Sequence, residues 1–121
     1  MPTTEEIEKY LELVRLFIVE DKVDFIKGSD EKYTLGKLGI SITDAFEMVK
    51  DLDVKNYYRG PSPDHRYPSQ QVWEFGIPEI FEDEIPPHRD LYVKLTFRNT
   101  RGDLLMMSFH KARDLITYPY K

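Results

Sequence analysis

The sequence contains no cysteine. This excludes a disulfide framework, a zinc site built from thiolates and a cysteine nucleophile. No apolar run approaches the ~18–20 residues that a membrane helix needs. The first ten residues, MPTTEEIEKY, lack the basic start and apolar run of a signal peptide. We therefore expect a cytoplasmic protein that does not contact the membrane.

Several signatures of enzyme chemistry are also missing. There is no GxSxG motif, no glycine-rich phosphate loop and no Rossmann fingerprint. The three histidines, His65, His88 and His110, show no close metal-ligand spacing, so we expect no metal and no cofactor. A metal-dependent hydrolase would need at least two of these histidines to converge with an acid.

The residues that are present are sufficient for one packed core. The 121 residues are 40% hydrophobic and 13% aromatic, which predicts a single domain over residues 1–121. The net charge of −5 is uneven, since residues 1–53 carry −6 and residues 54–121 carry +1. The second half is therefore locally basic, and the local field steers a polyanion more than the total charge does. The acidic half has a simpler explanation as a solvated face.

Two helices are predicted in the first half. Thr3 and Glu6 stand at capping-box spacing before apolar residues that recur at helical intervals up to Ile18. Leu13 and Leu16 widen this apolar stripe, so we expect the helix to lie deep against a sheet or a partner. A second helix starts near Ser41 and ends before KNYYRG. The stretch between the helices reads as irregular with at most one short strand.

The second half changes to a period of two, which is typical of strands. In QVWEFG, Trp73 and Phe75 face one side and Glu74 the other. LYVKLTFRN and DLLMMSFHKA are joined by NTRGD, where a three-residue loop needs a left-handed residue at Gly102. That loop fixes the expected register, which pairs Tyr92 with His110, Lys94 with Ser108, Val93 with Phe109, Leu95 with Met107, Phe97 with Leu105 and Asn99 with Asp103. The prediction is an α+β fold with two N-terminal helices packed on an antiparallel meander.

One sheet face is then expected to carry Tyr92, Lys94, Arg98 and His110 beside the loop NYYRGPSPDHRYPSQQ. Cleavage of RNA by its own 2′-hydroxyl needs a base, an acid and cations for the charge at phosphorus. Histidine, arginine and tyrosine can supply these functions without a metal. Simpler explanations stand beside this one, because outward strand residues are often only solvated and Arg59 can form an ordinary salt bridge.

The chain also resembles a known family. The blocks YYRGP.PD, VWEFG, LYVKL and SFH, within residues 38–113, are similar to those of the MqsR-type toxins, messenger-RNA interferases with a RelE-like fold. The resemblance implies a small α+β domain with a curved antiparallel sheet and metal-independent cleavage of single-stranded messenger RNA. It also implies a cognate antitoxin protein as partner, with no direct contact to DNA.

The resemblance assigns a set of site residues. It implies a catalytic site made of Arg59, Glu74, Tyr92 and His110. Around it we expect RNA-binding residues on the loop and the sheet face, namely His65, Arg66, Lys94, Arg98 and Lys111. Better-known members carry lysine in place of Arg59 and His110 and glutamine in place of Glu74, and they are typically basic. The alternative function is therefore a non-catalytic interaction module, or an inactive toxin homologue, that binds through its acidic N-terminal helix.

Overall fold

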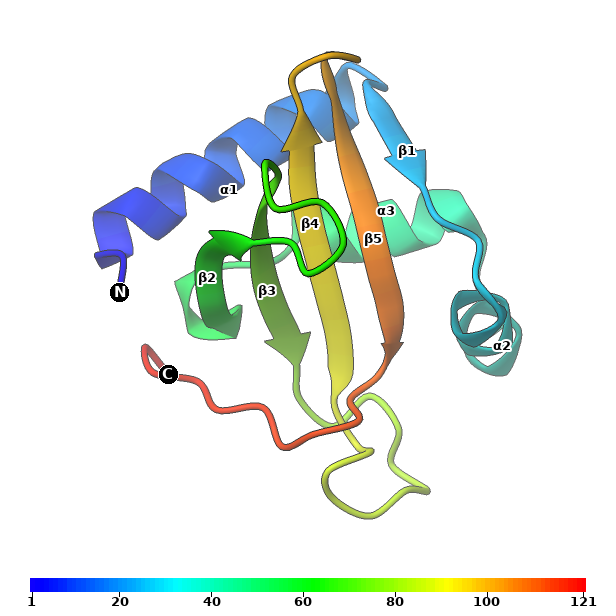
Figure 1. Ribbon diagram of the computed structural model, residues 1–121. Coiled ribbons are helices and arrows are strands. Elements are labelled where there is room, and N and C mark those ends of the chain that lie inside the picture. The colour runs from blue at the N-terminus through cyan, green and yellow to red at the C-terminus, as the bar shows by residue number, and fades with distance from the viewer.

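The computed structural model describes residues 1–121 and has an α+β fold (Figure 1). The helices are α1 (Thr4–Val19), α2 (Ser29–Leu38) and α3 (Ile42–Lys50), with a 3₁₀ turn η1 (Val54–Asn56). The strands are β1 (Val23–Phe25), β2 (Tyr57–Pro63), β3 (Gln71–Ile77), β4 (Leu91–Arg98) and β5 (Asp103–Lys111). They form one sheet in the order β1-β5-β4-β3-β2, in which β1 runs parallel to β5 and all other neighbours are antiparallel.

The two predicted helix starts are confirmed, because both capping boxes form. The Thr3 hydroxyl accepts a hydrogen bond from the Glu6 amide at 3.2 Å, and the Glu6 carboxylate accepts one from the Thr3 amide at 3.0 Å. Ser41 and Asp44 make the same reciprocal pair before α3. Local side-chain chemistry therefore sets where α1 and α3 begin.

The expected arrangement of two helices on an antiparallel meander is incomplete. The stretch read as irregular contains α2, and β1 adds a parallel edge strand that makes the sheet mixed. The first part of the expected loop NYYRGPSPDHRYPSQQ is also not a loop, because Tyr57–Pro63 forms strand β2. The sequence contains no apolar stripe that would predict α2, because the buried residues of this helix are the polar Glu31 and Thr34. It also lacks a capping signal, because the N-cap residue is Gly28. The Glu31 carboxylate accepts a hydrogen bond from the Phe109 amide at 3.3 Å, so α2 covers the edge of β5 that β1 is too short to reach.

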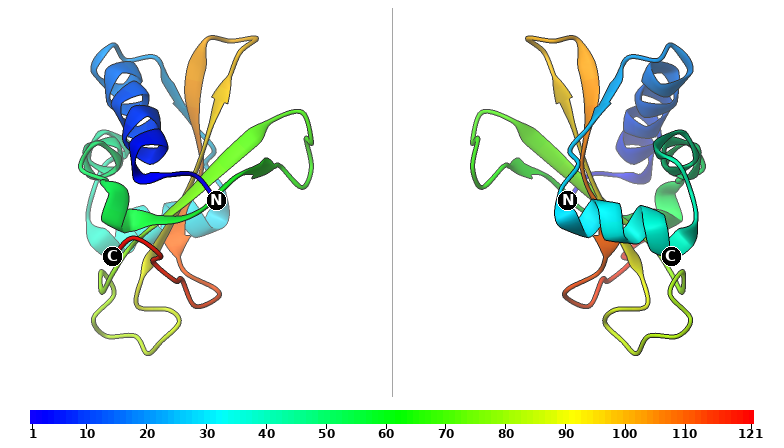
Figure 2. Two further views of the ribbon diagram at one scale, coloured as in Figure 1. Left: turned by 90° about the vertical axis from the view of Figure 1, so that its left-hand side faces the viewer. Right: turned by 90° about the vertical axis from the view of Figure 1, so that its right-hand side faces the viewer.

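The hydrophobic core lies between the sheet and the pair α1 and α3 (Figure 2). Ile7, Leu11 and Val14 of α1 are buried in it. Leu13 and Leu16, which we expected to widen the buried stripe, are 43% and 49% exposed on the outer side of α1. None of the helices has the length and apolar character needed to cross a membrane.

A β-bulge in β5 decides which side chains reach the open face of the sheet, opposite α1 and α3. Tyr92 pairs with His110 and Lys94 with Ser108, as predicted, but the register then shifts by one residue. Leu95 pairs with Met106, and Arg98 with Asp103, so the predicted pairs of Leu95 with Met107, Phe97 with Leu105 and Asn99 with Asp103 are wrong. The extra residue reverses the alternation of β5, which allows Leu104 and Met106 to be buried in the core while His110 points the opposite way.

The turn before β5 explains the error. The loop has four residues, 99–102, because Arg98 rather than Asn99 pairs with Asp103. Gly102 is left-handed, as expected, with φ 64°, and its amide donates to the Arg98 carbonyl at 2.8 Å. The longer loop and the bulge compensate for each other, so the predicted face of His110 is right although the predicted turn is not.

Candidate active site

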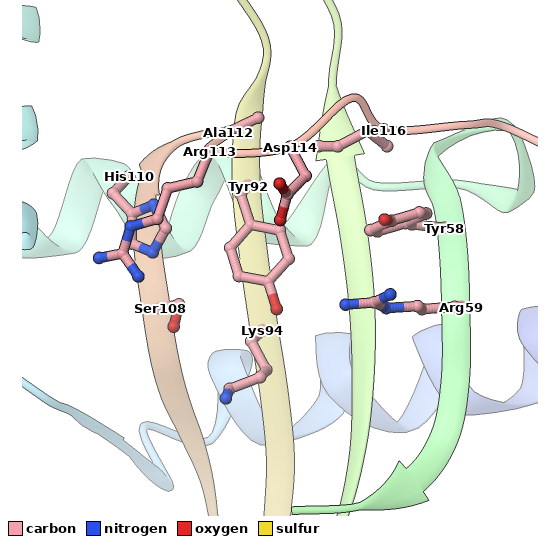
Figure 3. A pocket seen from close by; sticks show the side chains of 10 residues that line it. All are labelled: Tyr58, Arg59, Tyr92, Lys94, Ser108, His110, Ala112, Arg113, Asp114 and Ile116. Carbon is pink, nitrogen blue, oxygen red and sulfur yellow. The ribbon is translucent and has the colours of Figure 1, made fainter. Parts of the chain in front are cut away.

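A pocket of about 180 Å³ opens on the sheet face that α1 and α3 leave uncovered (Figure 3). Strands β2, β4 and β5 form its floor and one side, and the segment after β5 forms the other side. Its polar lining residues are Tyr58, Arg59, Tyr92, Lys94, Ser108, His110, Arg113 and Asp114. Four of these were predicted as site residues, namely Arg59, Tyr92, Lys94 and His110.

Glu74 lies under this pocket as the shared partner of two site residues. Its buried carboxylate, with a side chain only 7% exposed, accepts hydrogen bonds from Arg59 Nε at 2.7 Å and from another guanidinium nitrogen at 3.1 Å. It also accepts a short hydrogen bond from the Tyr92 hydroxyl. A buried carboxylate with three donors holds its donors in place. Glu74 is thus a positioning residue rather than a group that reaches a substrate.

The same contacts change the acidity of both partners. Burial, followed by the hydrogen bond to Glu74, raises the pKa of Tyr92 above its ordinary value. The hydrogen bond to Glu74 raises the pKa of Arg59. Tyr92 therefore keeps its proton at neutral pH, and Arg59 keeps its charge while 61% of its side chain remains exposed. Because only two of the guanidinium nitrogens bind Glu74, the remaining N–H groups of Arg59 are available to an anion.

His110 lies on the side of Tyr92 opposite Arg59 (Figure 3). Its Nδ1 lies 2.8 Å from the carbonyl oxygen of Lys111. Because a carbonyl only accepts, Nδ1 carries the hydrogen and the neutral ring has its lone pair on Nε2. The imidazole packs against the Tyr92 ring with 5.2 Å between centroids. His110 is thereby oriented with a basic nitrogen in a pocket that also holds cations.

The proline-rich loop between β2 and β3 supplies an anchor for Lys94. This loop projects from the open side of the sheet, in front of β4 (Figures 1 and 2). Its Asp64 is buried and accepts hydrogen bonds from the amides of Arg66 at 3.1 Å and Tyr67 at 2.9 Å. Asp64 also lies 3.6 Å from Lys94 Nζ. At that distance the ammonium is attracted without being saturated, so it can still donate to a ligand.

Arg59 owes its place to an irregularity in β2. The pairing with β3 shifts between Arg59 and Ser62. Gly60 has φ 112°, and a Cβ there would lie 2.6 Å from the Val72 carbonyl oxygen, so no other residue fits. The backbone turn that keeps Arg59 opposite Glu74 therefore requires glycine at position 60.

We predict that Asp64→Ala lowers the free energy of unfolding by about 2 kcal/mol, because it leaves two part-buried amide hydrogen bonds unmade and Lys94 without its partner. Burial raises the pKa of Asp64, but the Tyr67 and Arg66 amides and Lys94 outweigh it and lower the pKa overall. The contribution is therefore present above the ordinary aspartate pKa, ~3.9, and is lost as the pH falls through the lowered folded-state pKa. Urea unfolding at pH 7 and at progressively lower pH measures both effects.

The matched control is Glu82→Ala, which removes an exposed carboxylate from the loop between β3 and β4. We expect it to change the free energy of unfolding by less than about 0.5 kcal/mol. An Asp64 variant as stable as this control at pH 7 would contradict the proposed anchoring of the loop.

Four predicted RNA-binding residues lie outside the pocket. Arg98 is only 15% exposed and binds Asp24 at 2.8 Å and Asp103 at 2.6 Å, so it ties β1 to the hairpin instead of facing RNA. His65 and Arg66 are exposed on the loop but line none of the pocket wall. Lys111 is paired with Glu84 at 2.7 Å on the side of the sheet next to α2. Alternation along the strands gives the face of a side chain but not its partner.

Arg113 and Tyr58 were not predicted as site residues. Arg113 lies beside His110 in the pocket (Figure 3), although it follows β5 and belongs to no strand pattern. Its exposed guanidinium pairs with Asp30 of α2. Tyr58 stacks under the Arg59 guanidinium, with 4.7 Å from the guanidinium carbon to the ring centroid. Its position in the YY pair before Arg59 was the available signal for Tyr58, whereas nothing in the sequence pointed to Arg113.

Two of the three histidines converge more than their spacing suggested. His88 and His110 line a second pocket that also includes Asp30. However, Asp30 is paired with Arg113, and His88 Nδ1 bonds the Ala112 carbonyl oxygen at 2.9 Å. No group of three or more His, Cys, Asp or Glu side chains is arranged to hold a metal ion.

The site therefore combines one oriented imidazole and the exposed carboxylate of Asp114 with the cationic side chains of Arg59, Lys94 and Arg113, each cation placed by another carboxylate. Such a set can bind an oxyanion and can move a proton at its edge. Comparisons with protein-family models, with curated proteins and with solved structures give no match to this chain.

Proposed function

We propose that this chain is a metal-independent endoribonuclease, an mRNA interferase of the MqsR type from a bacterial type II toxin–antitoxin module. The observation that carries the proposal is the pocket that gathers His110, Arg59, Lys94 and Arg113 on the uncovered sheet face of a chain with net charge −5. An imidazole among three cations matches a phosphodiester, which is anionic and loses and gains protons when it is cleaved. The substrate is single-stranded messenger RNA in the cytoplasm.

The reaction needs no external nucleophile. The ribose 2′-oxygen attacks phosphorus, the new 2′-O–P bond forms and the P–O5′ bond breaks. His110 Nε2 takes the proton of the 2′-hydroxyl, because that nitrogen holds the lone pair of the neutral ring. The products are a 2′,3′-cyclic phosphate and a free 5′-hydroxyl. Arg59 and Arg113 bind the phosphate oxygens, on which negative charge grows in the transition state.

The leaving 5′-oxygen takes its proton from the Lys94 ammonium. An ammonium releases a proton more readily than a guanidinium does, which favours Lys94 over Arg59 and Arg113. Tyr92 is less suited as the acid, because burial and Glu74 raise its pKa and its proton already binds the Glu74 carboxylate. In this proposal Lys94, which was predicted to bind RNA, is a catalytic residue. Tyr92, which was predicted to be catalytic, instead packs against the His110 ring and keeps it oriented.

Glu74 is compatible with an anionic substrate in this arrangement. An unpaired carboxylate would repel a phosphodiester, but Arg59 and Tyr92 occupy Glu74 and hide it from the solvent. A neutral side chain at position 74 could also accept hydrogen bonds from Arg59 and Tyr92, but it would hold them less firmly. Hydrogen bonds to a charged group are roughly twice as strong as those between neutral groups. Rigid placement of the charged groups matters because misplacement of reacting groups by about 1 Å costs on the order of 10²-fold in rate.

A second candidate function is supported by the outer side of α1. Leu13, Leu16 and Val19 are 43%, 49% and 70% exposed, in a helix whose other exposed residues include several glutamates. This surface favours a protein partner, either a cognate antitoxin or, in a non-catalytic interaction module, another protein. The two functions are compatible, because the surface of α1 lies across the sheet from the pocket.

The deciding experiment is incubation of the purified protein with a long unstructured RNA in EDTA, followed by mapping of both new ends. We expect discrete cuts with 5′-hydroxyl and 2′,3′-cyclic phosphate ends. A parallel reaction without EDTA contains translating ribosomes, which need magnesium, and their messenger RNA. If neither reaction yields cuts, or if cuts in the ribosome-free RNA need a divalent metal, the ribonuclease proposal fails and the interaction module replaces it.

A further inference from the structure

A second pocket of about 220 Å³ adjoins the active-site pocket. The two pockets share His110, Ala112 and Arg113, so they lie on opposite sides of one thin wall. The far side of the second pocket is made by Tyr33 and Thr34 of α2 and by His88 from the loop between β3 and β4. A substrate that contacts His110 from the first pocket therefore has room for a neighbouring group on the other side.

Tyr33 gives this pocket an aromatic platform. Its side chain is 54% exposed, and its ring packs against no other aromatic residue. The Lys111 ammonium lies over one face of the ring, 5.2 Å from its centroid, and is held there by Glu84 at 2.7 Å. A base would stack on the other face, and an aromatic face together with a cation is the combination that single-strand binding proteins use for a nucleobase and its phosphate.

The same pocket offers polar groups that the protein leaves unused. The Thr34 hydroxyl is buried and has no hydrogen-bond partner. His88 Nδ1 bonds the Ala112 carbonyl oxygen at 2.9 Å, so Nδ1 carries the hydrogen and the neutral ring presents an acceptor at Nε2. A buried hydroxyl without a partner is costly, and the edge of a nucleobase carries both donors and acceptors that could satisfy it.

The shared His110 determines which nucleotide enters. In the proposed reaction His110 takes the proton of the 2′-hydroxyl, and that hydroxyl belongs to the nucleotide on the 5′ side of the cleaved bond. The base attached to the same ribose is the group nearest to the wall between the pockets. The phosphodiester itself remains with Arg59 and Arg113 in the first pocket.

We propose that the second pocket binds the base of the nucleotide on the 5′ side of the cleaved bond, with the base stacked on Tyr33 and its edge bonded by Thr34 and His88. This inference rests on the proposed ribonuclease function. It assigns α2, which carries no residue of the first pocket, the role of selecting the base at which the chain cuts.

The test is binding and cleavage with Tyr33→Ala, and its matched control is Tyr67→Ala. Tyr67 is similarly exposed, at 57%, but lies on the β2–β3 loop and lines neither pocket. The binding probe is a single-stranded RNA whose cleaved nucleotide carries a 2′-deoxyribose, so that no reaction can occur. We expect Tyr33→Ala to weaken binding about tenfold, as the loss of one stacked base does, and Tyr67→Ala to change it less than twofold.

Base selection is measured separately, with a pool of RNAs randomised at the nucleotide 5′ of the cut. Thr34→Val keeps the shape of the side chain and removes its hydroxyl. We expect it to flatten the base preference at that nucleotide without lowering the melting temperature, because the hydroxyl has no partner in the folded protein.

The outcomes separate the two proposals. If the wild type cleaves and the Tyr33 and Thr34 variants match it in binding and base preference, the base pocket is wrong and the ribonuclease stands. If the wild type binds the deoxy probe through Tyr33 but cleaves no RNA, the base pocket stands and the catalytic assignment is wrong. If the wild type does not bind the probe, the base pocket is wrong.

Discussion

Replacement of His110 by alanine is expected to lower the rate of RNA cleavage by about 10²- to 10⁴-fold, the usual contribution of a general base. The loss should be in kcat more than in KM, because in the proposed reaction His110 exchanges a proton whereas Arg59 and Arg113 bind the phosphate. Its side chain is buried against Tyr92, so the alanine variant also leaves a small cavity. His110→Gln, which fills most of that space but cannot act as a base near neutral pH, should lose the same activity.

Two controls protect this interpretation. Thermal unfolding of both His110 variants should remain cooperative, which shows that lost activity is not lost folding. His65→Ala removes an exposed histidine that lines neither pocket, and we expect less than a threefold change in rate. Cleavage at the wild-type rate by His110→Gln would show that the imidazole takes no proton in the reaction, and the base would then have to be sought elsewhere in the pocket.

The parts of the fold that sequence could predict are those with local causes. Thr3 and Ser41 each satisfy amides within the same turn, so their helices start where their capping boxes stand. The pairing of Tyr92 with His110 was predicted correctly only because the longer loop and the bulge in β5 offset each other. By contrast, α2 has no such signal. Glu31 and Thr34 of α2 are buried because the helix covers the edge of β5. That edge is formed by a distant part of the chain, so the local sequence of α2 does not reveal it.

The site shows the same division. Strand face was enough to place Tyr92, Lys94 and His110 together, and Arg59 was added by the family resemblance, but the partner of each cation could not be read from its own neighbourhood. Arg98 is 74 residues away from one of its two carboxylate partners, Asp24, and that pairing removes it from the candidate site. Long-range ion pairs of this kind depend on how elements meet, whereas alternation depends only on the chain's own period.

The proline-rich loop also acquires its meaning only in three dimensions. From sequence it looked like a rim that presents His65 and Arg66 to RNA. In the fold its buried residue is Asp64, which faces Lys94 across the open side of the sheet. The loop therefore acts on the site through a carboxylate that tethers the lysine, while its own basic residues remain in solvent.

Lys94 provides the second large effect, and it separates charge from proton transfer. Lys94→Arg keeps a cation beside Asp64 but replaces an ammonium by a group that holds its proton more tightly. We expect kcat to fall about 10²-fold with KM nearly unchanged, since loss of a general acid slows the chemical step alone. Lys94→Met, which removes the charge as well, should lower kcat further and also raise KM.

A substrate with a better leaving group tests this assignment independently of folding. When the 5′-oxygen is replaced by sulfur at the cleaved bond, the leaving thiolate needs no proton, so the general acid becomes dispensable. Lys94→Arg should then cleave the sulfur-substituted RNA nearly as fast as the wild type, whereas His110→Gln should remain slow because the 2′-hydroxyl still needs a base. If Lys94→Arg stays equally impaired on both substrates, Lys94 is a binding cation only. Tyr92, whose hydroxyl is the remaining proton donor beside it, would then be the acid despite its raised pKa.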